Sequence, residues 1–418
     1  MLTDASDWGW SRRFLGPIGW LGSRSVTRFT VEERRARLAT RHHLAPSSAA
    51  ASPTDVGRSL VALHSTDPAS VYLSCLARTV AGDTASIDRA LYDERSLVRM
   101  LGMRRTVFVV PAELVSVVHS ACTRAIAAAE RRKLVQLLEQ AGIASDGASW
   151  LRQVEEATMA ALEARGQALG QELSAAVPGL REQISFGDET KKWAGVTAVT
   201  TRVLFLLSAD GRIVRGRPRG SWISSQYRWV PQADWLGPAL PEPPSEVARV
   251  ELARRWLTAF GPAAPADLRW WTGWTAGETK RVLSEIEPAE VDLDGMAGIV
   301  LPDDLVPTAP VQPWAALLPA LDPTVMGWAE RSWFLGDGER AALFDRSGNA
   351  GPTVWWAGEV VGGWAQRRDG EIALRLLRDI GADGVAAVHT VAERLQKSLG
   401  DVRITPRFRT PIERGLCA

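Results

Sequence analysis

The hydrophobic positions in the first quarter of the chain predict several helices that lead into one β-hairpin. Apolar residues recur at helical spacing in four segments, 31–44, 53–63, 69–78 and 85–93. The stretch SLVRMLGMRRTVFVVP (96–111) then changes to the alternation and β-branched composition of strands, with Gly102 at the turn. Helices followed by a hairpin are typical of a winged-helix unit.

The same arrangement of helices and a hairpin recurs twice further along the chain. Helical patterns cover 111–140, 147–165, 168–180 and 195–211, and an arginine-rich hairpin or wing follows at 212–230. The proline-rich stretch LPEPPSE (240–246) marks a boundary. Beyond it we expect a helix at 245–260, a helix-turn-helix at 264–286, short strands at 288–301, 353–367 and 372–376, and a closing helix at 382–399.

These patterns predict a mainly α protein with β-hairpins, an α+β fold divided into five parts. The parts are an N-terminal extension (1–27), three tandem winged-helix units (28–145, 146–240 and 241–300) and a β-rich C-terminal region (301–418). Arg12 and Arg13 in the extension precede an apolar segment that glycine and proline interrupt and that is too short for an export signal. We therefore interpret the first residues as an extension and not as a targeting signal.

Composition places the chain among globular proteins of a reducing compartment. It is 46% hydrophobic and 23% charged, and no apolar run reaches the length of about 18 residues that a membrane span needs. Its three cysteines are far apart and odd in number, so we expect no disulfide framework and a cytoplasmic location. The net charge of +1 gives no overall case for nucleic-acid binding.

The motifs of common enzyme classes are missing from the sequence. It contains no glycine-rich nucleotide loop of Rossmann or P-loop type, no H-E-x-x-H, no C-x-x-C and no G-x-S-x-G. The five histidines form no pair at metal-ligand spacing. We therefore expect neither a metal nor an organic cofactor.

Arginine dominates the basic residues and gathers in the predicted hairpins. Only five of the 49 basic residues are lysines, which leaves 44 arginines; codon bias alone would explain this excess, but arginine also suits phosphate contacts. In the wing GRIVRGRPRGSW, alternation would put three arginines on one face next to a tryptophan, although an exposed solubilising hairpin has the same pattern. The candidate DNA-binding residues are Arg104, Arg105, Arg215, Arg217, Arg219, Trp222, Arg346 and Asn349. Most of the 18 tryptophans, including Trp270, are expected to pack in the core.

One stretch gathers polar groups in an unusual way. In SLVALHSTDPASVYLS (59–74), Leu63 closes an apolar pattern that predicts the end of a helix, and His64, Ser65, Thr66 and Asp67 follow. Such residues are ordinary turn formers and helix caps. They are also groups that can hold a water molecule or move a proton. Residue chemistry alone leaves both interpretations open.

Four blocks of the chain resemble the AlkZ/YcaQ-like winged-helix DNA glycosylases of bacteria. They are LVALHSTDPASVYLSCLARTV, RALYDERSLVRMLGMRRTVFVVP, LLPALDPTVMGW and DRSGNAGPTVWWAGEVVGGWAQR, in an order that spans about residues 28–410. The resemblance implies three tandem winged-helix units around a C-shaped DNA-binding channel. It also implies hydrolysis of the N-glycosidic bond of alkylated purines, including bulky adducts and crosslinks, and in some members self-resistance to a DNA-alkylating product.

The family's catalytic Gln-x-Gln or Gln-x-Asp motif falls on His-Ser-Thr in this sequence. His64 takes the first position and Thr66 the second, with Asp67 next. Our hypothesis is that His64 holds the attacking water, with Thr66 as a second partner, while Asp67 either stabilises the sugar cation or orients His64. The nearest lysine in sequence is Lys133, so we expect a monofunctional enzyme without a lyase step.

The resemblance also sets the expected partner and an alternative class. We expect a monomer that acts on double-stranded DNA, with a preference for bulky N7-guanine adducts or crosslinks, because a large adduct is hard to extrude into a closed pocket. A non-catalytic winged-helix DNA-binding protein, such as a transcriptional regulator, would also explain the arginine hairpins and the missing glutamines. Tandem units over 418 residues fit a regulator less well.

Overall fold

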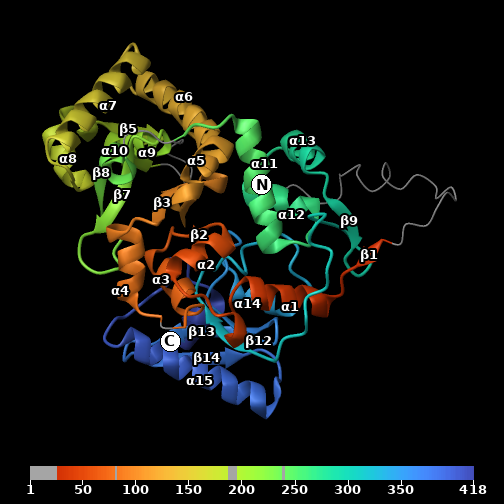
Figure 1. The fold of residues 1–418 in the computed structure, drawn as a ribbon. Coiled ribbons are helices and arrows are strands. Elements are labelled where there is room, and N and C mark those ends of the chain that lie inside the picture. The colour runs from red at the N-terminus through yellow and green to blue at the C-terminus, as the bar shows by residue number, and fades with distance from the viewer. Residues whose placement is uncertain (1–25, 81, 187–194, 238–240) are drawn as a thin grey trace.

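A computed structural model describes residues 26–80, 82–186, 195–237 and 241–418. Nearly all of the predicted extension lies outside these residues, and its last residue already belongs to a strand. The described parts of the chain contain no helix that is both long and apolar enough to cross a membrane. The model is a mixed arrangement of helices and small sheets, as the hydrophobic pattern predicts (Figure 1).

The first group of elements surrounds a three-stranded sheet. Its strands β2 (Leu63–His64), β4 (Val107–Pro111) and β3 (Leu97–Leu101) lie in that order and are antiparallel. The helices are α1 (Val31–Arg41), α2 (Pro53–Leu60), α3 (Pro68–Leu76) and α4 (Thr84–Asp88). The prediction that helix 53–63 includes Leu63 is wrong: α2 ends at Leu60 because Val61 adopts a φ of +64°, and the chain then enters β2.

Most of the second group forms a lobe, coloured amber to green at the upper left of Figure 1. Val115 and Val118, at its start, belong instead to the core that the other groups share. The helices of the second group are α5 (Val115–Val118), α6 (Arg124–Gln140), α7 (Gly147–Glu163), α8 (Gly170–Ala176), α9 (Val199–Ala209) and α10 (Gln232–Leu236). Two antiparallel hairpins accompany them, β5 (Gln183–Phe186) with β6 (Gly195–Ala198), and β7 (Ile213–Pro218) with β8 (Tyr227–Pro231). The second hairpin lies where the sequence predicts a wing, and it is called the wing below. The helix predicted at 195–211 starts later, at Val199, because its first residues form β6.

The third group begins after the proline-rich boundary. It contains α11 (Ser245–Phe260), α12 (Pro265–Thr272), α13 (Ala276–Ile286) and the strands β9 (Ala289–Asp292) and β10 (Ala297–Val300). The strand β1 (Thr27–Arg28) pairs in parallel with β9. Local sequence explains the start of α13: Thr275 and Glu278 exchange backbone and side-chain hydrogen bonds in a capping box.

The C-terminal region is a four-stranded antiparallel sheet with flanking helices. The strand order is β11 (Ala315–Leu318), β12 (Thr353–Trp356), β13 (Glu359–Gln366) and β14 (Ile372–Leu376). The helices are α14 (Asp337–Leu343), α15 (Gly381–Leu399) and α16 (Pro411–Leu416). Figure 1 shows this region, in blue, beneath α2 and α3.

The buried apolar side chains cluster within the second group and also across the boundaries between the groups. One cluster lies within the second group, between Leu134 and Trp229. The largest cluster joins the first group, the third group and the C-terminal region, and another joins α2, α3 and β3 to β13 and α15. Packing therefore fixes the segment 61–67 between the first group and the C-terminal sheet.

Candidate functional site

The chain leaves α2 through a strained residue and then forms the short strand β2, which ends at His64. The rest of the motif, up to Asp67, follows this strand. Val61 has a φ of +64°, which is sterically costly for a β-branched residue. His64 pairs with Phe108 in β4, and the Ser65 N–H donates to the Val107 carbonyl at 2.9 Å. Backbone strain of this kind persists where the surrounding structure enforces it, and it is concentrated at functional sites.

His64 is buried without a hydrogen-bond partner. Its residue exposure is 4%, and neither ring nitrogen has a partner among the described residues. The ring packs against Phe108, with centroids 4.5 Å apart. Burial, and next the positive charge of Arg104, lower the pKa of His64 to about 3. The imidazole is therefore neutral at physiological pH and retains a nitrogen that can accept a proton.

Ser65, the middle residue of the motif, accepts a hydrogen bond from a buried arginine. Arg99 Nε donates to Ser65 Oγ at 2.6 Å, and Arg99 Nη1 donates to the Tyr92 hydroxyl at 3.0 Å. The guanidinium also lies 4.4 Å from the ring centroid of Tyr227, which belongs to the wing strand β8. The motif is thus linked to the wing of the second group. Sequence reasoning missed these contacts, because the partners are distant in sequence.

Thr66 and Asp67 start helix α3 and contact the C-terminal segment. Asp67 is the N-cap: its Oδ1 accepts the Ala69 N–H at 3.1 Å, and its Oδ2 accepts the Arg407 N–H at 3.0 Å. Arg407 Nη1 also donates to the Thr66 carbonyl at 3.3 Å. Burial raises the pKa of Asp67, while these N–H donors and the Arg407 charge oppose the shift. A role as helix cap therefore accounts for the contacts of Asp67. His64 makes no contact of this kind, so capping does not account for its presence.

A fully buried ion pair helps to hold helix α3 in place. Arg78 and Asp322 form two short contacts, Nη2 to Oδ1 at 2.7 Å and Nη1 to Oδ2 at 2.8 Å, and neither side chain is exposed. Ser74 donates to the same carboxylate at 2.7 Å, and Ser70 donates to the Ala320 carbonyl at 2.7 Å. The block LLPALDPTVMGW is therefore the support of the helix that follows the motif.

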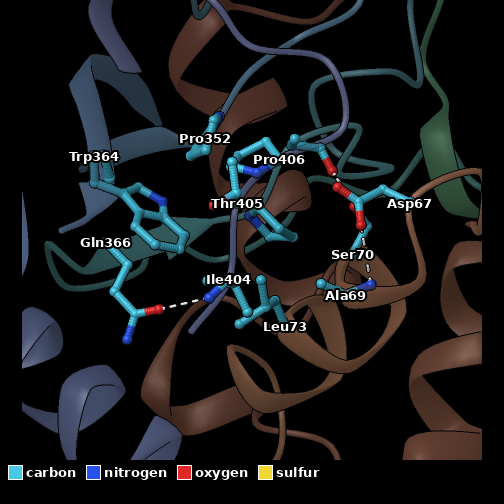
Figure 2. A pocket seen from close by; sticks show the side chains of 13 residues that line it. Asp67, Ala69, Ser70, Leu73, Pro352, Trp364, Gln366, Ile404, Thr405 and Pro406 are labelled. Carbon is cyan, nitrogen blue, oxygen red and sulfur yellow. Dashed lines mark hydrogen bonds between the residues drawn. The ribbon is translucent and has the colours of Figure 1, made fainter. Parts of the chain in front are cut away.

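A small pocket lies behind Asp67, between α3, β13 and the C-terminal segment (Figure 2). Asp67 and Ser70 face Thr405 on one side, and Gln366, whose side chain accepts the Ile404 N–H at 2.8 Å, lies on the other. The cavity measures about 20 Å³, which is enough for a water molecule and far too little for a purine. This pocket therefore does not receive a base.

The three arginines that the sequence predicts on one face of the wing have different surroundings. Arg215 is half-buried and stacks on Trp229 at 4.6 Å. Arg217 is exposed and pairs with Asp88 at 2.9 Å and Asp93 at 3.0 Å, and Arg219 is exposed. A shift of register between Arg215 and Pro218 interrupts the simple alternation of strand faces. The structure thus brings Arg217 to the first group and leaves Arg219 at the surface.

The remaining candidate DNA-binding residues lie apart from one another. Trp222 stacks on Tyr72 at 4.8 Å, and Asn349 donates to Asp345 at 2.9 Å in a turn that leaves Arg346 exposed. Arg105 is exposed and pairs with Glu130 at 2.9 Å. Arg104 is half-buried and stacks on Trp270 at 4.1 Å.

Metal coordination finds no support in the described residues. No cluster of three or more histidine, cysteine, aspartate or glutamate side chains occurs among them that could hold an ion. The three cysteines are free thiols, and burial raises the pKa of Cys75 and Cys122 to about 12.

The fold as a whole matches that of a solved DNA glycosylase. The structure of Streptomyces sahachiroi DNA glycosylase AlkZ aligns with a TM-score of 0.68 and 21% sequence identity, over 91% of this chain and 99% of that chain. Comparison with curated protein sequences gives no match. A family model described as "DNA glycosylase AlkZ-like" matches residues 58–398, which include the motif. The protein belongs to the family of AlkZ-like DNA glycosylases, as the four sequence blocks predict.

Proposed function

We propose that this protein is a monofunctional DNA glycosylase that hydrolyses the N-glycosidic bond of alkylated purines in double-stranded DNA, acting as a monomer. The observation that carries the proposal is the neutral, buried and unpartnered imidazole of His64, at the position that the sequence resemblance aligns with the family's catalytic glutamine. Family membership over residues 58–398 supports the reaction class. The three groups of helices and hairpins would be winged-helix units that surround a DNA channel.

The proposed reaction needs little help at the leaving base. Alkylation at N7 or N3 makes the purine cationic, so the C1′–N bond breaks with its electron pair moving to the base. Water attacks C1′, and His64 accepts the proton that the water loses. Thr66 is half-buried, the most open of the motif residues, and offers the water a second hydrogen-bond partner. The carboxylate of Asp67 stabilises positive charge on the sugar.

Access to the motif bears on the choice of substrate. His64 and Asp67 are 4% and 6% exposed, so a nucleotide reaches them only after neighbouring side chains move. The pocket behind Asp67 is too small for an extruded base. We therefore propose that the lesion is approached from the groove, which favours bulky N7-guanine adducts or crosslinks over small methyl adducts. Self-resistance to a genotoxic natural product would be one use of such an activity.

The test is excision from a duplex that carries one defined N7-alkylguanine, followed by alkali to cut abasic sites. We expect strand cleavage with the wild-type protein and its loss in His64→Ala and Asp67→Asn. The matched control is His389→Ala, because His389 is exposed on α15. His64→Gln restores the family's own residue and shows whether hydrogen bonding without a basic nitrogen is enough.

The competing function is a non-catalytic DNA-binding protein. The exposed arginines of the wing and the cap contacts of Asp67 would serve that function equally well. Binding to the duplex without cleavage, for small and bulky adducts alike, would exclude the glycosylase and favour the regulator.

A further inference from the structure

The hairpin turn beside the motif is built to hold one arginine against helix α12. Arg104 lies in the turn between β3 and β4 with a φ of +53°, and its guanidinium carbon is 4.1 Å from the ring centroid of Trp270. Gly273 ends α12 with a φ of +76°, and a Cβ at that position would come within 3.0 Å of Arg104 Cγ. The absence of a side chain at Gly273 therefore makes room for the arginine.

A second arginine lies over the same indole. Arg331 is 6% exposed, and its guanidinium carbon is 4.9 Å from the Trp270 centroid. Its Nε donates to the Val325 carbonyl at 2.8 Å, and Nη1 donates to the Ala329 carbonyl at 3.3 Å. Its Nη2 is buried and has no hydrogen-bond partner among the described residues. With two guanidiniums over its ring, Trp270 is not free to stack on a DNA base.

Neither guanidinium has a carboxylate partner within the described residues. The Arg104 side chain makes no hydrogen bond or ion pair there, and its buried Nε is unpartnered. Burial lowers the pKa of both side chains to about 10, and the positive charges of Arg340 and Arg104 lower that of Arg331 further. Asp267 and Glu330 favour the charged form of Arg331, but neither lies within ion-pair distance of it, and Asp267 accepts three backbone N–H groups. The two positively charged guanidiniums thus lie over the same indole, and no carboxylate of the described residues lies within ion-pair distance of either.

The position of this pair relates it to the motif. Arg104 lies in the turn that leads into β4, the strand that pairs with His64, and its positive charge also lowers the pKa of His64. Arginine suits a phosphodiester because its planar fork can donate two parallel hydrogen bonds to phosphate oxygens. We propose that Arg104 and Arg331, spread over Trp270, form a phosphate-binding site that holds one backbone phosphodiester of DNA beside the target nucleotide. The proposal rests on the proposed function, since it takes DNA as the substrate.

Such a site would do two things for the reaction. It would fix the distance between the sugar of the target nucleotide and the motif without reading the base, as phosphate contacts generally position and do not specify. On binding it would also bring an anion within ion-pair distance of the two guanidiniums, which have no such partner among the described residues. An open groove that accepts bulky lesions needs such an anchor, because the lesion itself fits no tight pocket.

The test combines DNA in which one backbone phosphate is replaced by an uncharged group with protein variants in which one arginine loses its charge. A series of lesion duplexes carries one uncharged methylphosphonate at each backbone position around the target, and binding is measured by fluorescence anisotropy. We expect one position to weaken wild-type binding about tenfold and to have little further effect on Arg104→Gln. We also expect Arg104→Gln to lower the slope of log K against log salt by about 1. Equal effects of every methylphosphonate on wild type and variant would overturn the proposal.

Matched variants separate a lost contact from lost folding. Arg255→Gln removes the same charge from an exposed arginine of α11 that pairs with Glu251, and we expect no selective loss at any one phosphate. Arg104→Lys and Arg331→Lys keep the charge, and we expect partial recovery of binding at the same position. If Arg255→Gln reproduces the pattern of Arg104→Gln, the site is wrong.

The two proposals fail separately in this design. Excision by the wild type on the unmodified lesion duplex reports on the proposed function alone. Binding and its phosphate dependence report on the arginine pair, whether or not excision occurs. Normal excision together with identical phosphate profiles for wild type and Arg104→Gln would leave the glycosylase standing and remove the phosphate site.

Discussion

At the scale of single residues, the two most deeply buried histidines behave in opposite ways. His42 uses both ring nitrogens, with Thr324 Oγ1 at 2.8 Å and the Ala259 carbonyl at 3.1 Å. His64 uses neither, although leaving a buried polar group unpaired costs about 1–3 kcal/mol. An apolar side chain beside Phe108 would avoid that cost. The comparison therefore favours a functional role for His64 and a structural role for His42.

The first prediction concerns the pH dependence of excision. Because burial and Arg104 lower the pKa of His64 to about 3, its neutral form dominates well below pH 6. The single-turnover rate, corrected for spontaneous depurination, should stay level from pH 8 to about pH 5 if His64 accepts the proton. An acidic limb near the ordinary histidine pKa of about 6.5 that is lost in His64→Gln would contradict the lowered pKa, because His64 would then titrate as an exposed imidazole does. His64→Gln should have lower rates with no acidic limb from this group.

The sequence predicted the location of the motif but only some of its contacts. Asp67 before Pro68 indicates a helix start, and the structure has Asp67 as the N-cap of α3. The bond from Arg99 to Ser65 spans 34 residues, and the bond from Arg407 to Asp67 spans 340. No local pattern indicates such pairs, because tertiary packing alone brings them together.

At the scale of elements, helix α3 depends on the cap that belongs to the motif. Both carboxylate oxygens of Asp67 accept backbone N–H groups, one from Ala69 and one from Arg407. Asp67→Asn leaves one of these donors without an acceptor, and we expect a loss of about 1 kcal/mol in the free energy of unfolding. Asp67→Ala loses both acceptors and should cost about 2 kcal/mol. Urea unfolding measures both, and equal stability of all three proteins would refute the cap.

The buried ion pair of Arg78 and Asp322 gives a second prediction for helix α3. Burial alone raises the pKa of Asp322, but the Arg78 charge and its hydrogen bonds bring it below its ordinary value. Removing one partner leaves the other charge buried and unpaired, so Arg78→Met or Asp322→Leu should each cost about 3–5 kcal/mol. The double variant should cost less than the sum of the two single variants. Thermal or urea unfolding measures the stability of each variant. If the loss in the double variant equals the sum of the two single losses, the two side chains do not interact.

Helices were predicted better than the segments between them. The helix predicted at 245–260 is α11, because its apolar spacing and the preceding prolines are local signals. The end of α2 was missed because Val61 takes a backbone conformation that its sequence disfavours. Several arginines and tryptophans also have a structural role that local patterns do not show. Arginine side chains stack on Trp229, Trp235, Trp270 and Trp333.

At the scale of the whole molecule, the second group meets the first through its wing. Tyr227 of β8 lies under Arg99, and Arg217 of β7 lies 4.7 Å from the ring centroid of Tyr92 while pairing with Asp88 and Asp93. The wing therefore approaches the element that contacts Ser65. Any movement of the second group around DNA would change the surroundings of the motif as well.

The carboxylates that hold Arg217 should compete with DNA for it. Asp93 is 60% exposed at its side chain and accepts from Arg217 Nη2 at 3.0 Å. Asp93→Asn frees one side of the guanidinium, and we expect tighter duplex binding by about threefold at low salt, as expected for an exposed pair worth less than 1 kcal/mol. The gain should shrink as salt rises, because exposed charges are screened.

Two further variants decide whether this gain belongs to Arg217. Asp383→Asn removes the same charge from an exposed position at the start of α15 and should change affinity less than Asp93→Asn. Arg217→Gln should weaken binding and abolish the gain when combined with Asp93→Asn. If Asp93→Asn and Asp383→Asn tighten binding equally, or if the gain survives Arg217→Gln, then Arg217 only joins the two groups and does not contact DNA.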